Sequence, residues 1–164
     1  MEPWTKQDVL QLLSDKGIAF TVNEHPAVYT MQEMEAVGLP HTEDICKNLF
    51  LRDAKGKRHF LVSLEKTKRA DLGRLGEQLG CGKLSFASEE RLQRLLGLSR
   101  GAVSPLGLLN DADRAVEMVF DRDLEKHPQL GVHPCDNTAT VWLSFLDLRR
   151  LIEERGNPVS IIEL

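Results

Sequence analysis

One segment near the middle of the chain restricts the fold more than any other. Lys47 to Leu64 reads KNLFLRDAKGKRHFLVSL, with two apolar-rich runs on either side of the turn sequence DAKG. Gly56 supplies the permissive backbone position that a tight turn between paired strands needs. Because a hairpin pairs its strands in antiparallel fashion, a purely parallel sheet is excluded for this chain.

Helix start and stop signals divide the rest of the chain into short elements. Serine or threonine caps and closing glycines predict helices between Thr5 and Gly17, Thr30 and Gly38, Ser88 and Gly97, and Ser144 and Gly156. A fifth helix is expected from Ala70 to about Leu79. Apolar runs predict strands over 18–25, 114–121, 138–145 and 158–164. The segments 101–109 and 122–135 are expected to be irregular.

This order of elements mixes strands and helices around a hairpin, which favours an α/β (α+β) fold. A length of 164 residues suits one hydrophobic core, and the chain has no repeat and no low-complexity linker. We therefore expect a single compact domain over residues 1–164, with a mixed, largely antiparallel sheet surrounded by helices. No long apolar heptad pattern is present, so we expect a monomer.

The sequence also indicates where the protein works. No apolar run approaches the roughly 20 residues that span a bilayer, and the acidic start MEPWTKQDVL lacks the pattern of a secretory signal. We expect a cytoplasmic protein with no membrane partner. Its three cysteines, Cys46, Cys81 and Cys135, form no C-x-x-C pair and are interpreted as reduced thiols.

Charge is distributed unevenly along the chain. The net charge is −4, which argues against a non-specific nucleic-acid binder. Between Lys47 and Arg69, however, eight basic residues are opposed only by Asp53 and Glu65. Such a segment could contact a phosphate backbone, or it could be a solvated hairpin whose lysines protect against aggregation. Composition alone leaves both interpretations open.

The stretch GVHPCDNTATVW, residues 131–142, is the first candidate for chemistry. His133, Cys135 and Asp136 lie close together, but the five histidines form no H-x-x-x-H pair, and no second cluster supplies further metal ligands. Cys135 follows a proline in a loop rather than opening a helix, so it is a weak nucleophile candidate. We expect no metal and no cofactor, because phosphate-binding and dinucleotide glycine motifs are also missing.

Gly101 to Pro105, GAVSP, is a second candidate. The glycine allows close approach to the backbone and the proline fixes the loop, so its N–H groups could face a carbonyl or a phosphate. A plain connection between a helix and a strand is the alternative.

Three separated segments together resemble one family. These are CKNLFLRD with Lys47 and Asn48, GAVSPLGL with Gly101 and Pro105, and GVHPCDNTATV with His133. EHPAVYT resembles an early segment of the same family. In this order and spacing they are similar to the freestanding prolyl-tRNA editing family (YbaK/ProX-like), related to the editing domain inserted in some prolyl-tRNA synthetases. Within this family, the KNLFL segment and the histidine loop are most similar to those of the alanyl-tRNA(Pro) deacylases.

The resemblance implies the YbaK/prolyl-tRNA synthetase-associated domain fold and a deacylase acting in trans on the acceptor end of tRNA(Pro) charged with alanine. Prolyl-tRNA synthetase is a further partner that it suggests. A synthetase pocket shaped for proline rejects a smaller apolar residue by only about 1–3 kcal/mol, so a second, smaller pocket is needed for accuracy. An aminoacyl ester is already activated, so oriented water and a stabilised oxyanion suffice without a metal or a covalent nucleophile.

By the same resemblance, Lys47, Asn48, Gly101 and His133 are the candidate catalytic residues. Lys47 would steady a phosphate or the charge on the ester, and His133 would line the pocket and help to exclude proline. The expected substrate-binding residues are Tyr29, Ala102, Val103, Ser104, Pro105, Gly131, Asp136 and Asn137. Asp136 could receive the substrate's α-ammonium group or form a turn, and His25 could contact the pocket wall or the tRNA end. The basic run from Arg52 to Arg69 becomes a candidate acceptor-stem contact.

Two other functions remain open at this point. The substrate could be Cys-tRNA(Pro) or tRNA carrying another small amino acid. The chain could also be a tRNA- or synthetase-binding module that has kept the fold and lost hydrolysis.

Overall fold

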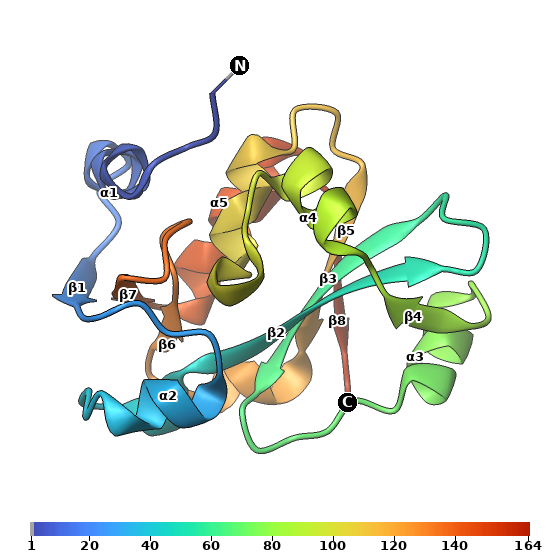
Figure 1. Cartoon of the computed structure of the whole chain (residues 1–164), viewed down its shortest axis with the longest axis horizontal. Coiled ribbons are helices and arrows are strands. Elements are labelled where there is room, and N and C mark those ends of the chain that lie inside the picture. The colour runs from blue at the N-terminus through green and yellow to red at the C-terminus, as the bar shows by residue number, and fades with distance from the viewer. Residues whose placement is uncertain (1) are drawn as a thin grey trace.

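The structure is a computed structural model that describes residues 2–164, and it contains five α-helices and eight strands within that range. Figure 1 shows them as α1 Lys6–Asp15, β1 Phe20–Glu24, α2 Met31–Ala36, β2 Cys46–Asp53, β3 His59–Glu65, α3 Leu72–Leu79, β4 Leu84–Phe86, α4 Glu89–Leu96, β5 Val116–Asp121, β6 Leu130–Val132, β7 Ala139–Leu143, α5 Phe145–Arg155 and β8 Val159–Ile162. Short 3₁₀ turns occupy Thr42–Asp44, Arg100–Ala102, Pro105–Asn110 and Arg122–Lys126.

The strands form two sheets rather than one. Five strands are ordered β4-β2-β3-β5-β8, and three are ordered β1-β7-β6. The β3–β5 and β5–β8 pairs are parallel and the other pairs are antiparallel, so the predicted mixed, largely antiparallel α+β domain is confirmed. Among the described residues, one isolated bridge, between Ile45 just before β2 and Gly131 of β6, joins the two sheets.

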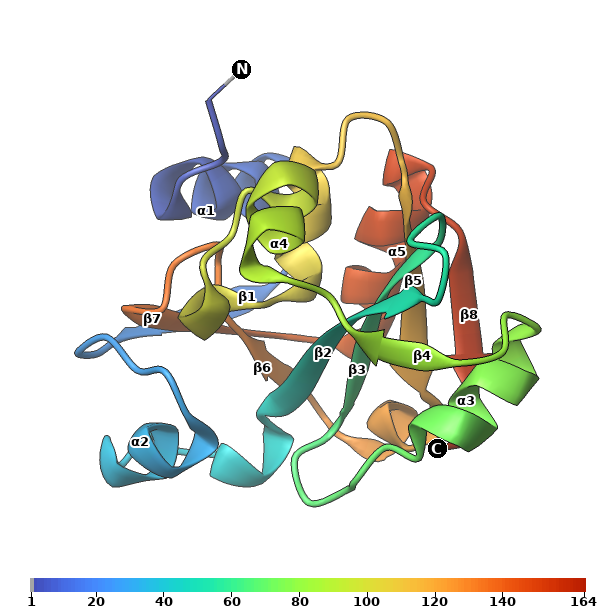
Figure 2. The same cartoon turned by 45° about the vertical axis from the view of Figure 1, so that its right-hand side comes forward.

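The predicted hairpin is β2–β3, paired from Cys46 opposite Glu65 to Arg52 opposite His59. Both of its faces are buried, which explains its nearly continuous apolar runs. Phe50 and Leu61 face the main core, which also holds residues of α1, α4, α5 and β7, while Leu51 and Phe60 face a smaller core under α3. Figure 2 shows α3 on one side of this sheet and α4 and α5 on the other.

Most helix signals are confirmed. The side chains of Thr5, Thr30, Ser88 and Ser144 each accept the main-chain N–H three residues later, as N-caps do. The helix expected from Ala70 begins at Leu72 instead, because Asp71 provides its cap. No helix in the described range is long and apolar enough to cross a bilayer.

Three expectations about local structure were wrong. The segment 122–135 is not wholly irregular, because it contains β6, and β4 was not expected at all. Both strands have only three residues, too few for a periodic apolar signal. The segment 101–109 is not an open loop either, since Ser104 caps a 3₁₀ turn over Pro105–Asn110 that is buried in the core.

Candidate active site

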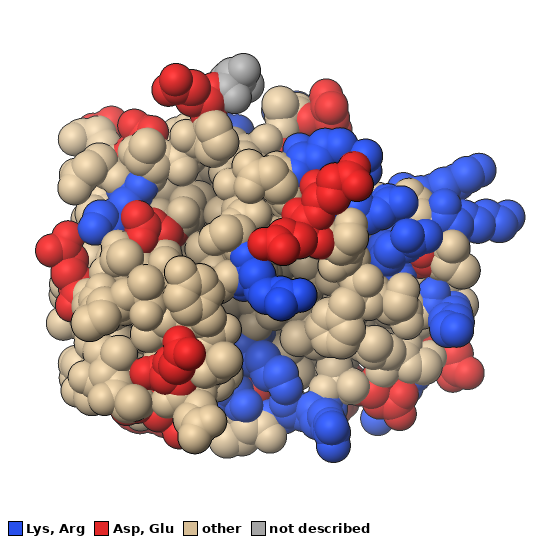
Figure 3. All heavy atoms as spheres, viewed as in Figure 1, with Lys and Arg blue, Asp and Glu red and all other residues tan. Residues whose placement is uncertain are grey.

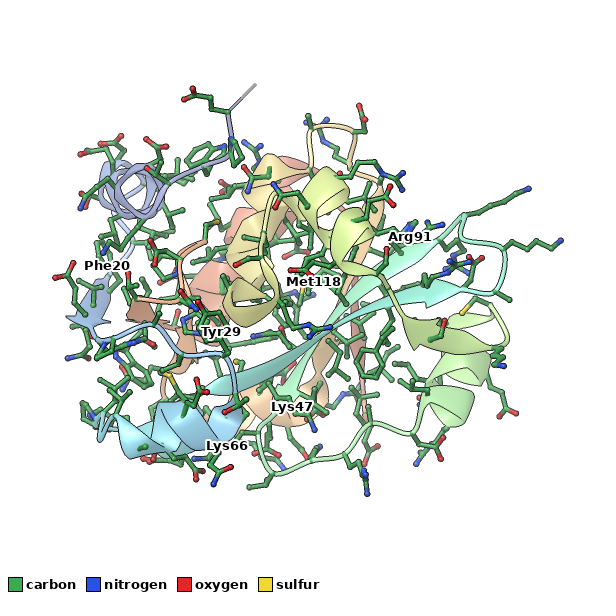
Figure 4. The ribbon with its side chains drawn as sticks, viewed as in Figure 1. Phe20, Tyr29, Lys47, Lys66, Arg91 and Met118 are labelled. Atoms are coloured by element: carbon green, nitrogen blue, oxygen red, sulfur yellow. The ribbon has the colours of Figure 1, made fainter. Side chains whose placement is uncertain are left out.

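A cavity of about 170 Å³ opens where the two sheets meet. Its walls come from the start of β2, the end of β6, β7, α2 and the loop before it, and the loop at 100–103. Seven predicted site residues line it: Tyr29, Lys47, Asn48, Gly101, Val103, Gly131 and His133. Figure 4 shows Tyr29 and Lys47 on the same side of the molecule. The cavity is smaller than the roughly 300–1,000 Å³ of sites for drug-sized ligands, and suits a small group.

The ammonium group of Lys47 is held by the chain that follows β3. Its Nζ donates to the main-chain oxygen of Lys68 at 3.0 Å. Lys68 is itself fixed, because its Nζ lies 3.0 Å from Asp121 Oδ1 and 2.6 Å from Asp123 Oδ2. Burial lowers the pKa of Lys68, but its hydrogen bonds to Asp123 and Asp121 outweigh burial and raise it. The Lys47 ammonium group in the cavity wall is thus positioned by the main chain of Lys68, whose own side chain is held by two carboxylates.

His127 continues this charged network toward the cavity. Its Nδ1 lies 2.7 Å from Asp44 Oδ1, and its Nε2 lies 2.7 Å from Glu65 Oε2. Burial acts to lower the pKa of His127, but the hydrogen bonds to the two carboxylates outweigh burial and raise it. Since Asp44 directly precedes Ile45 and β2, the network fixes the start of the strand that carries Lys47 and Asn48.

Two groups of acidic and histidine side chains have ligand atoms within 4.8 Å of one another, namely His41, Glu43 and Asp44, and Glu65, Asp121 and Asp123. Neither group lines the cavity. The Lys68 ammonium group lies among the carboxylates of the second group and contacts all three.

Asn48 is oriented by its partner in the hairpin. Ser63 lies opposite Asn48 in the β2–β3 register, and its hydroxyl donates to Asn48 Oδ1. The Asn48 amide nitrogen has only a long contact of 3.5 Å, to the main-chain oxygen of Cys46. Its N–H groups therefore remain available to a ligand in the cavity.

Gly101 is a glycine because neighbouring groups occupy the space of a side chain. A Cβ atom there would lie 2.7 Å from Tyr29 Cδ1, 2.9 Å from Asn137 Nδ2 and 2.9 Å from the main-chain oxygen of Val28. Asn137 does not line the cavity, but its Nδ2 donates to Val28 O at 2.8 Å and so holds the 28–29 segment over Gly101. Tyr29 is 62% exposed, so its ring forms an outer wall.

The remaining residues of the predicted loop do not line the cavity. Ala102 and Pro105 are buried in the core, and the Ser104 hydroxyl accepts the N–H of Leu106 as a cap. These three residues shape the loop, while Gly101 and Val103 face the cavity. The Ala102 N–H is used by Ser99 O, whereas no described residue accepts the Val103 N–H.

His133 presents one ring nitrogen to the cavity. Its Nδ1 lies 2.8 Å from the main-chain oxygen of Ala139, which can only accept, so Nδ1 carries the proton. Burial lowers the pKa of His133, and the nearby His25 ring, 6.0 Å away between centroids, lowers it further. The ring is therefore neutral near pH 7, and its Nε2, which no described residue contacts, is a hydrogen-bond acceptor.

Gly131, two residues before His133, lies against the ring of Trp142. A Cβ at Gly131 would lie 2.6 Å from Trp142 Cζ3. Trp142 belongs to a small core with Val28, Met34 and Ile45, beneath the cavity. The glycine allows β6 to lie directly on the ring of Trp142 and leaves the cavity open above it.

Thr140 lines the cavity next to His133 and was not predicted from sequence. Its Oγ1 lies 2.9 Å from His25 Nε2, and His25 Nδ1 lies 2.9 Å from Pro26 O. In the tautomer whose Nδ1–H donates to Pro26 O, the Thr140 hydroxyl donates to His25 Nε2 and keeps its lone pairs free. His25 does not line the cavity and acts as support for Thr140.

The side chains of Cys135 and Asp136 have structural roles rather than catalytic ones. Burial raises the pKa of the Cys135 thiol to about 12, which keeps it protonated and disfavours it as a nucleophile. Asp136 Oδ1 accepts the N–H of Thr138 at 2.8 Å, and the Thr138 hydroxyl, which also donates to it, lowers the pKa of Asp136. Asp136 does not line the cavity, which favours the turn over the ammonium-binding alternative.

The basic run of the sequence is divided by the fold. Its later part is largely paired, since Arg58 contacts Glu117, Lys66 contacts Glu35 and Lys68 lies among carboxylates. The hairpin turn carries Arg52, Lys55 and Lys57, for which the described residues provide no ion pair. Figure 3 shows Lys and Arg side chains gathered at this end of the molecule and in a band through the middle of the same face.

Several cavity residues gave no signal in the sequence. Arg100 lines the cavity beside Gly101, and Met31 and Met34 of α2 close it from the other side. The methionines were read only as part of a short helix. Arg100 precedes the glycine of the predicted loop, and this adjacency is the one signal that could have identified it.

Comparison with known proteins agrees with this geometry. Residues 25–151 match the family model described as aminoacyl-tRNA editing domain. The chain is 48% identical over 164 residues to the prolyl-tRNA editing protein ProX of Acetoanaerobium sticklandii, with 100% of both chains covered. It is 36% identical over 163 residues to the prolyl-tRNA synthetase associated domain-containing protein 1 of Danio rerio, covering 96% of this chain and 86% of that protein.

A similar solved structure is described as "Crystal structure of a putative trans-editing enzyme for prolyl tRNA synthetase". It superposes with a TM-score of 0.72 at 25% sequence identity, over 98% of each chain. A second structure, of hypothetical protein APE2540, has a TM-score of 0.72 at 22% identity and shares the fold.

Proposed function

The chain belongs to the aminoacyl-tRNA editing family, and from that premise we propose that it hydrolyses Ala-tRNA(Pro) in trans. The family is described as an aminoacyl-tRNA editing domain and a relative is named a prolyl-tRNA editing protein, which supports deacylation of mischarged tRNA(Pro). The choice of alanine is our proposal. The whole chain, 1–164, is assigned to one editing domain, acting as a monomer in the cytoplasm where tRNA is charged.

The observation that carries the proposal is the composition of the cavity. A recess of about 170 Å³ brings together Lys47, Asn48, Gly101 and His133, and no carboxylate of residues 2–164 lines it. The thiol that does line it, Cys46, is an unsuitable nucleophile because burial raises its pKa to about 12. This arrangement fits an activated ester that needs positioning and oxyanion stabilisation rather than a covalent intermediate.

In the proposed mechanism, the aminoacyl ester carbonyl lies near Lys47 and the loop at 101–103. The Lys47 ammonium group and the Val103 N–H, which no described residue accepts, stabilise the negative charge that develops on the carbonyl oxygen. A water molecule attacks the carbonyl carbon, the bond to the ribose oxygen breaks, and that oxygen leaves with a proton. Alanine and uncharged tRNA are released. In this proposal, the vicinal ribose hydroxyl of the substrate assists the proton transfer.

His133 is proposed to form the wall of the amino-acid recess. Its ring is fixed by Ala139 O and is neutral, so its Nε2 can accept a hydrogen bond from the substrate. With Gly131, it sets the size that admits alanine and excludes proline. Asn48, oriented by Ser63, donates to the substrate or to the attacking water.

The proposed partners are the acceptor end of tRNA(Pro) and, on the names of relatives, prolyl-tRNA synthetase. A Cys-tRNA(Pro) deacylase remains the second candidate within this class, because a cavity of this volume also admits a small thiol side chain.

The test is a deacylation assay with Ala-tRNA(Pro), Cys-tRNA(Pro) and Pro-tRNA(Pro) as parallel substrates. We expect alanine release well above spontaneous hydrolysis and no release of proline. Hydrolysis of the cysteinyl substrate alone would select the second candidate. Binding of charged tRNA without release of any amino acid would indicate a non-catalytic module and overturn the proposal.

A further inference from the structure

Two arginine side chains converge at the tip of the β2–β3 hairpin, far from the cavity. A Cβ on Gly56 would lie 3.0 Å from Arg52 Nη2 and 2.9 Å from Arg91 Nη2, so these two nitrogens lie within about 6 Å of each other. Arg52 belongs to β2, whereas Arg91 reaches the turn from α4. Figure 4 shows Arg91 at the hairpin end opposite to Lys47.

Main-chain carbonyl groups of the turn hold both guanidinium groups in place. Arg52 Nη2 donates to Ala54 O at 3.1 Å, and Arg91 Nη1 donates to Gly56 O at 3.3 Å. Arg91 Nη1 also lies 2.9 Å from His59 Nε2. The two cations are therefore oriented before any ligand arrives, and each keeps further N–H donors free.

Within the described residues, no carboxylate lies within 4.0 Å of a basic nitrogen of Arg52, Lys55, Lys57 or Arg91, a set that we name the hairpin-tip cluster. The nearest acidic residue in sequence, Asp53, uses its Oδ1 to accept the N–H groups of Lys57 and Arg58. Burial lowers the pKa of the adjacent His59, and Arg91 lowers it further. The site thus has a positive potential that the protein itself does not neutralise.

Convergent guanidinium groups without a carboxylate partner repel each other unless an anion joins them. The planar guanidinium fork matches the oxygens of a phosphate group, and two exposed lysines beside it suit a repeating phosphate backbone. Lys55 and Lys57 are exposed, so they can follow such a backbone. An RNA duplex presents that chemistry.

We propose that the hairpin-tip cluster binds phosphates of the double-stranded part of tRNA while the charged 3′ end occupies the cavity. At about 3.3 Å per residue, the strand from Asn48 to Lys55 places the tip roughly 20 Å from the cavity, beyond the reach of the terminal nucleotide. The inference rests on the proposed function and adds a second contact on the same substrate. Contacts of this kind position a nucleic acid without reading its sequence.

The experiment compares two substrates that share the reacting ester, full-length Ala-tRNA(Pro) and an alanylated CCA trinucleotide. The first variant combines Lys55→Gln with Lys57→Gln, which removes no contact within the fold, and the second combines Arg52→Gln with Arg91→Gln. The α1 control combines Lys6→Gln, at the first residue of α1, with Lys16→Gln, at its C-cap, at the opposite end of the molecule in Figure 1, for the same change in net charge. Each of these lysines loses an ion pair with an exposed carboxylate, Glu24 or Glu154, and such surface pairs contribute little to stability.

We expect both tip variants to raise KM for the full-length tRNA roughly tenfold, with kcat nearly unchanged, and to leave the trinucleotide unaffected. Each lost phosphate contact should also reduce the slope of log(kcat/KM) against log[salt] by about 0.9 in magnitude. The α1 control should behave as wild type. Equal effects on both substrates, or unchanged KM and salt slope, would overturn the inference.

A failure of the proposed function would be seen separately. If the wild type hydrolyses neither substrate, binding of uncharged tRNA(Pro) is measured by fluorescence anisotropy. Affinity that falls in the tip variants but not in the α1 control supports the inference. Affinity that is equal in all of them refutes it.

Discussion

Lys47 Nζ donates to the main-chain oxygen of Lys68, so two lysines separated by a hairpin act as one unit. The ammonium group of Lys68 is held by Asp121, which is fully buried, and by Asp123. The ion pairs of the Lys68 side chain thus fix the position of its main-chain carbonyl group, and that carbonyl group holds the Lys47 ammonium group in the cavity wall. The first prediction follows from this relationship.

Lys68→Met should destabilise the fold and lower kcat with little change in KM. The buried Asp121 carboxylate would lose its cation, which costs roughly 3–5 kcal/mol, measured by chemical denaturation. Lys66→Met is the matched control, because its partner Glu35 is 61% exposed and the pair contributes about 0–1 kcal/mol. Equal losses in the two variants, or an unchanged kcat in Lys68→Met, would contradict this account of Lys47.

His133→Ala should widen the amino-acid recess and admit proline. We expect the preference for Ala-tRNA(Pro) over Pro-tRNA(Pro), measured as a ratio of kcat/KM values, to fall roughly ten- to 200-fold. His41→Ala is the control, since His41 is exposed and does not line the cavity. Selectivity that survives in His133→Ala would exclude a role for this ring in size discrimination.

Gly101→Ala should damage catalysis more than stability. The added Cβ would press on Tyr29 Cδ1 and on the main-chain oxygen of Val28, and a displacement of this loop by about 1 Å can cost a hundredfold in rate. Gly73→Ala in α3 serves as the comparison, because its Cβ would only meet Asp71 Oδ1 at 3.4 Å. That change should raise stability by about 0.5–1 kcal/mol and leave kcat/KM unchanged. A fully active Gly101→Ala enzyme would rule out the tight packing described for this loop.

The pH dependence of stability should reveal His127 between Asp44 and Glu65. Its folded-state pKa lies above the ordinary value of 6.5, so its contribution is complete below about pH 6.5 and is lost as the pH rises through the folded-state pKa. The lowered pKa values of His133 and His59 act in the opposite direction, reducing stability as the pH falls below 6.5.

Comparison with His127→Gln separates these effects. The difference in unfolding free energy between wild type and variant, followed by denaturation from pH 5.5 to 8.5, should be largest at the acidic end and shrink as the pH rises. A difference that stays constant with pH would show that folding leaves the pKa of His127 unchanged, and would contradict the raised pKa described here.

The sequence predicted those parts of the fold that carry local signals. The hairpin, the capped helices and the α+β class follow from turn chemistry, caps and apolar period. The division into two sheets was missed, because β6 has three residues and its pairing depends on contacts distant in sequence. The parallel pairing of β3 with β5 likewise depends on contacts between residues distant in sequence.

The sequence also identified candidate site residues that the fold brings together, and the roles given to them stay predictions. Lys47, Asn48, Gly101 and His133 were identified from segments that resemble a family, and the fold brings them to one cavity. Thr140 and Arg91 were missed for different physical reasons. In the sequence, Thr140 cannot be distinguished from any other β-branched residue of an apolar strand, because its contact with His25 is formed only in the fold. Arg91 is 35 positions from Gly56 and reaches the hairpin turn only through tertiary packing.

The bridge between Ile45 and Gly131 is the only pairing that joins the two sheets in the described range, and the cavity lies beside it. The dimensions of the cavity therefore depend on the angle at which the sheets meet, and buried residues that do not line the cavity, such as Trp142, contribute to that angle. Within this architecture, substrate preference can be retuned during evolution by exchanges in the hydrophobic interior while every residue facing the substrate stays the same. Searches for specificity determinants in relatives should include the buried residues beneath the bridge that joins the two sheets.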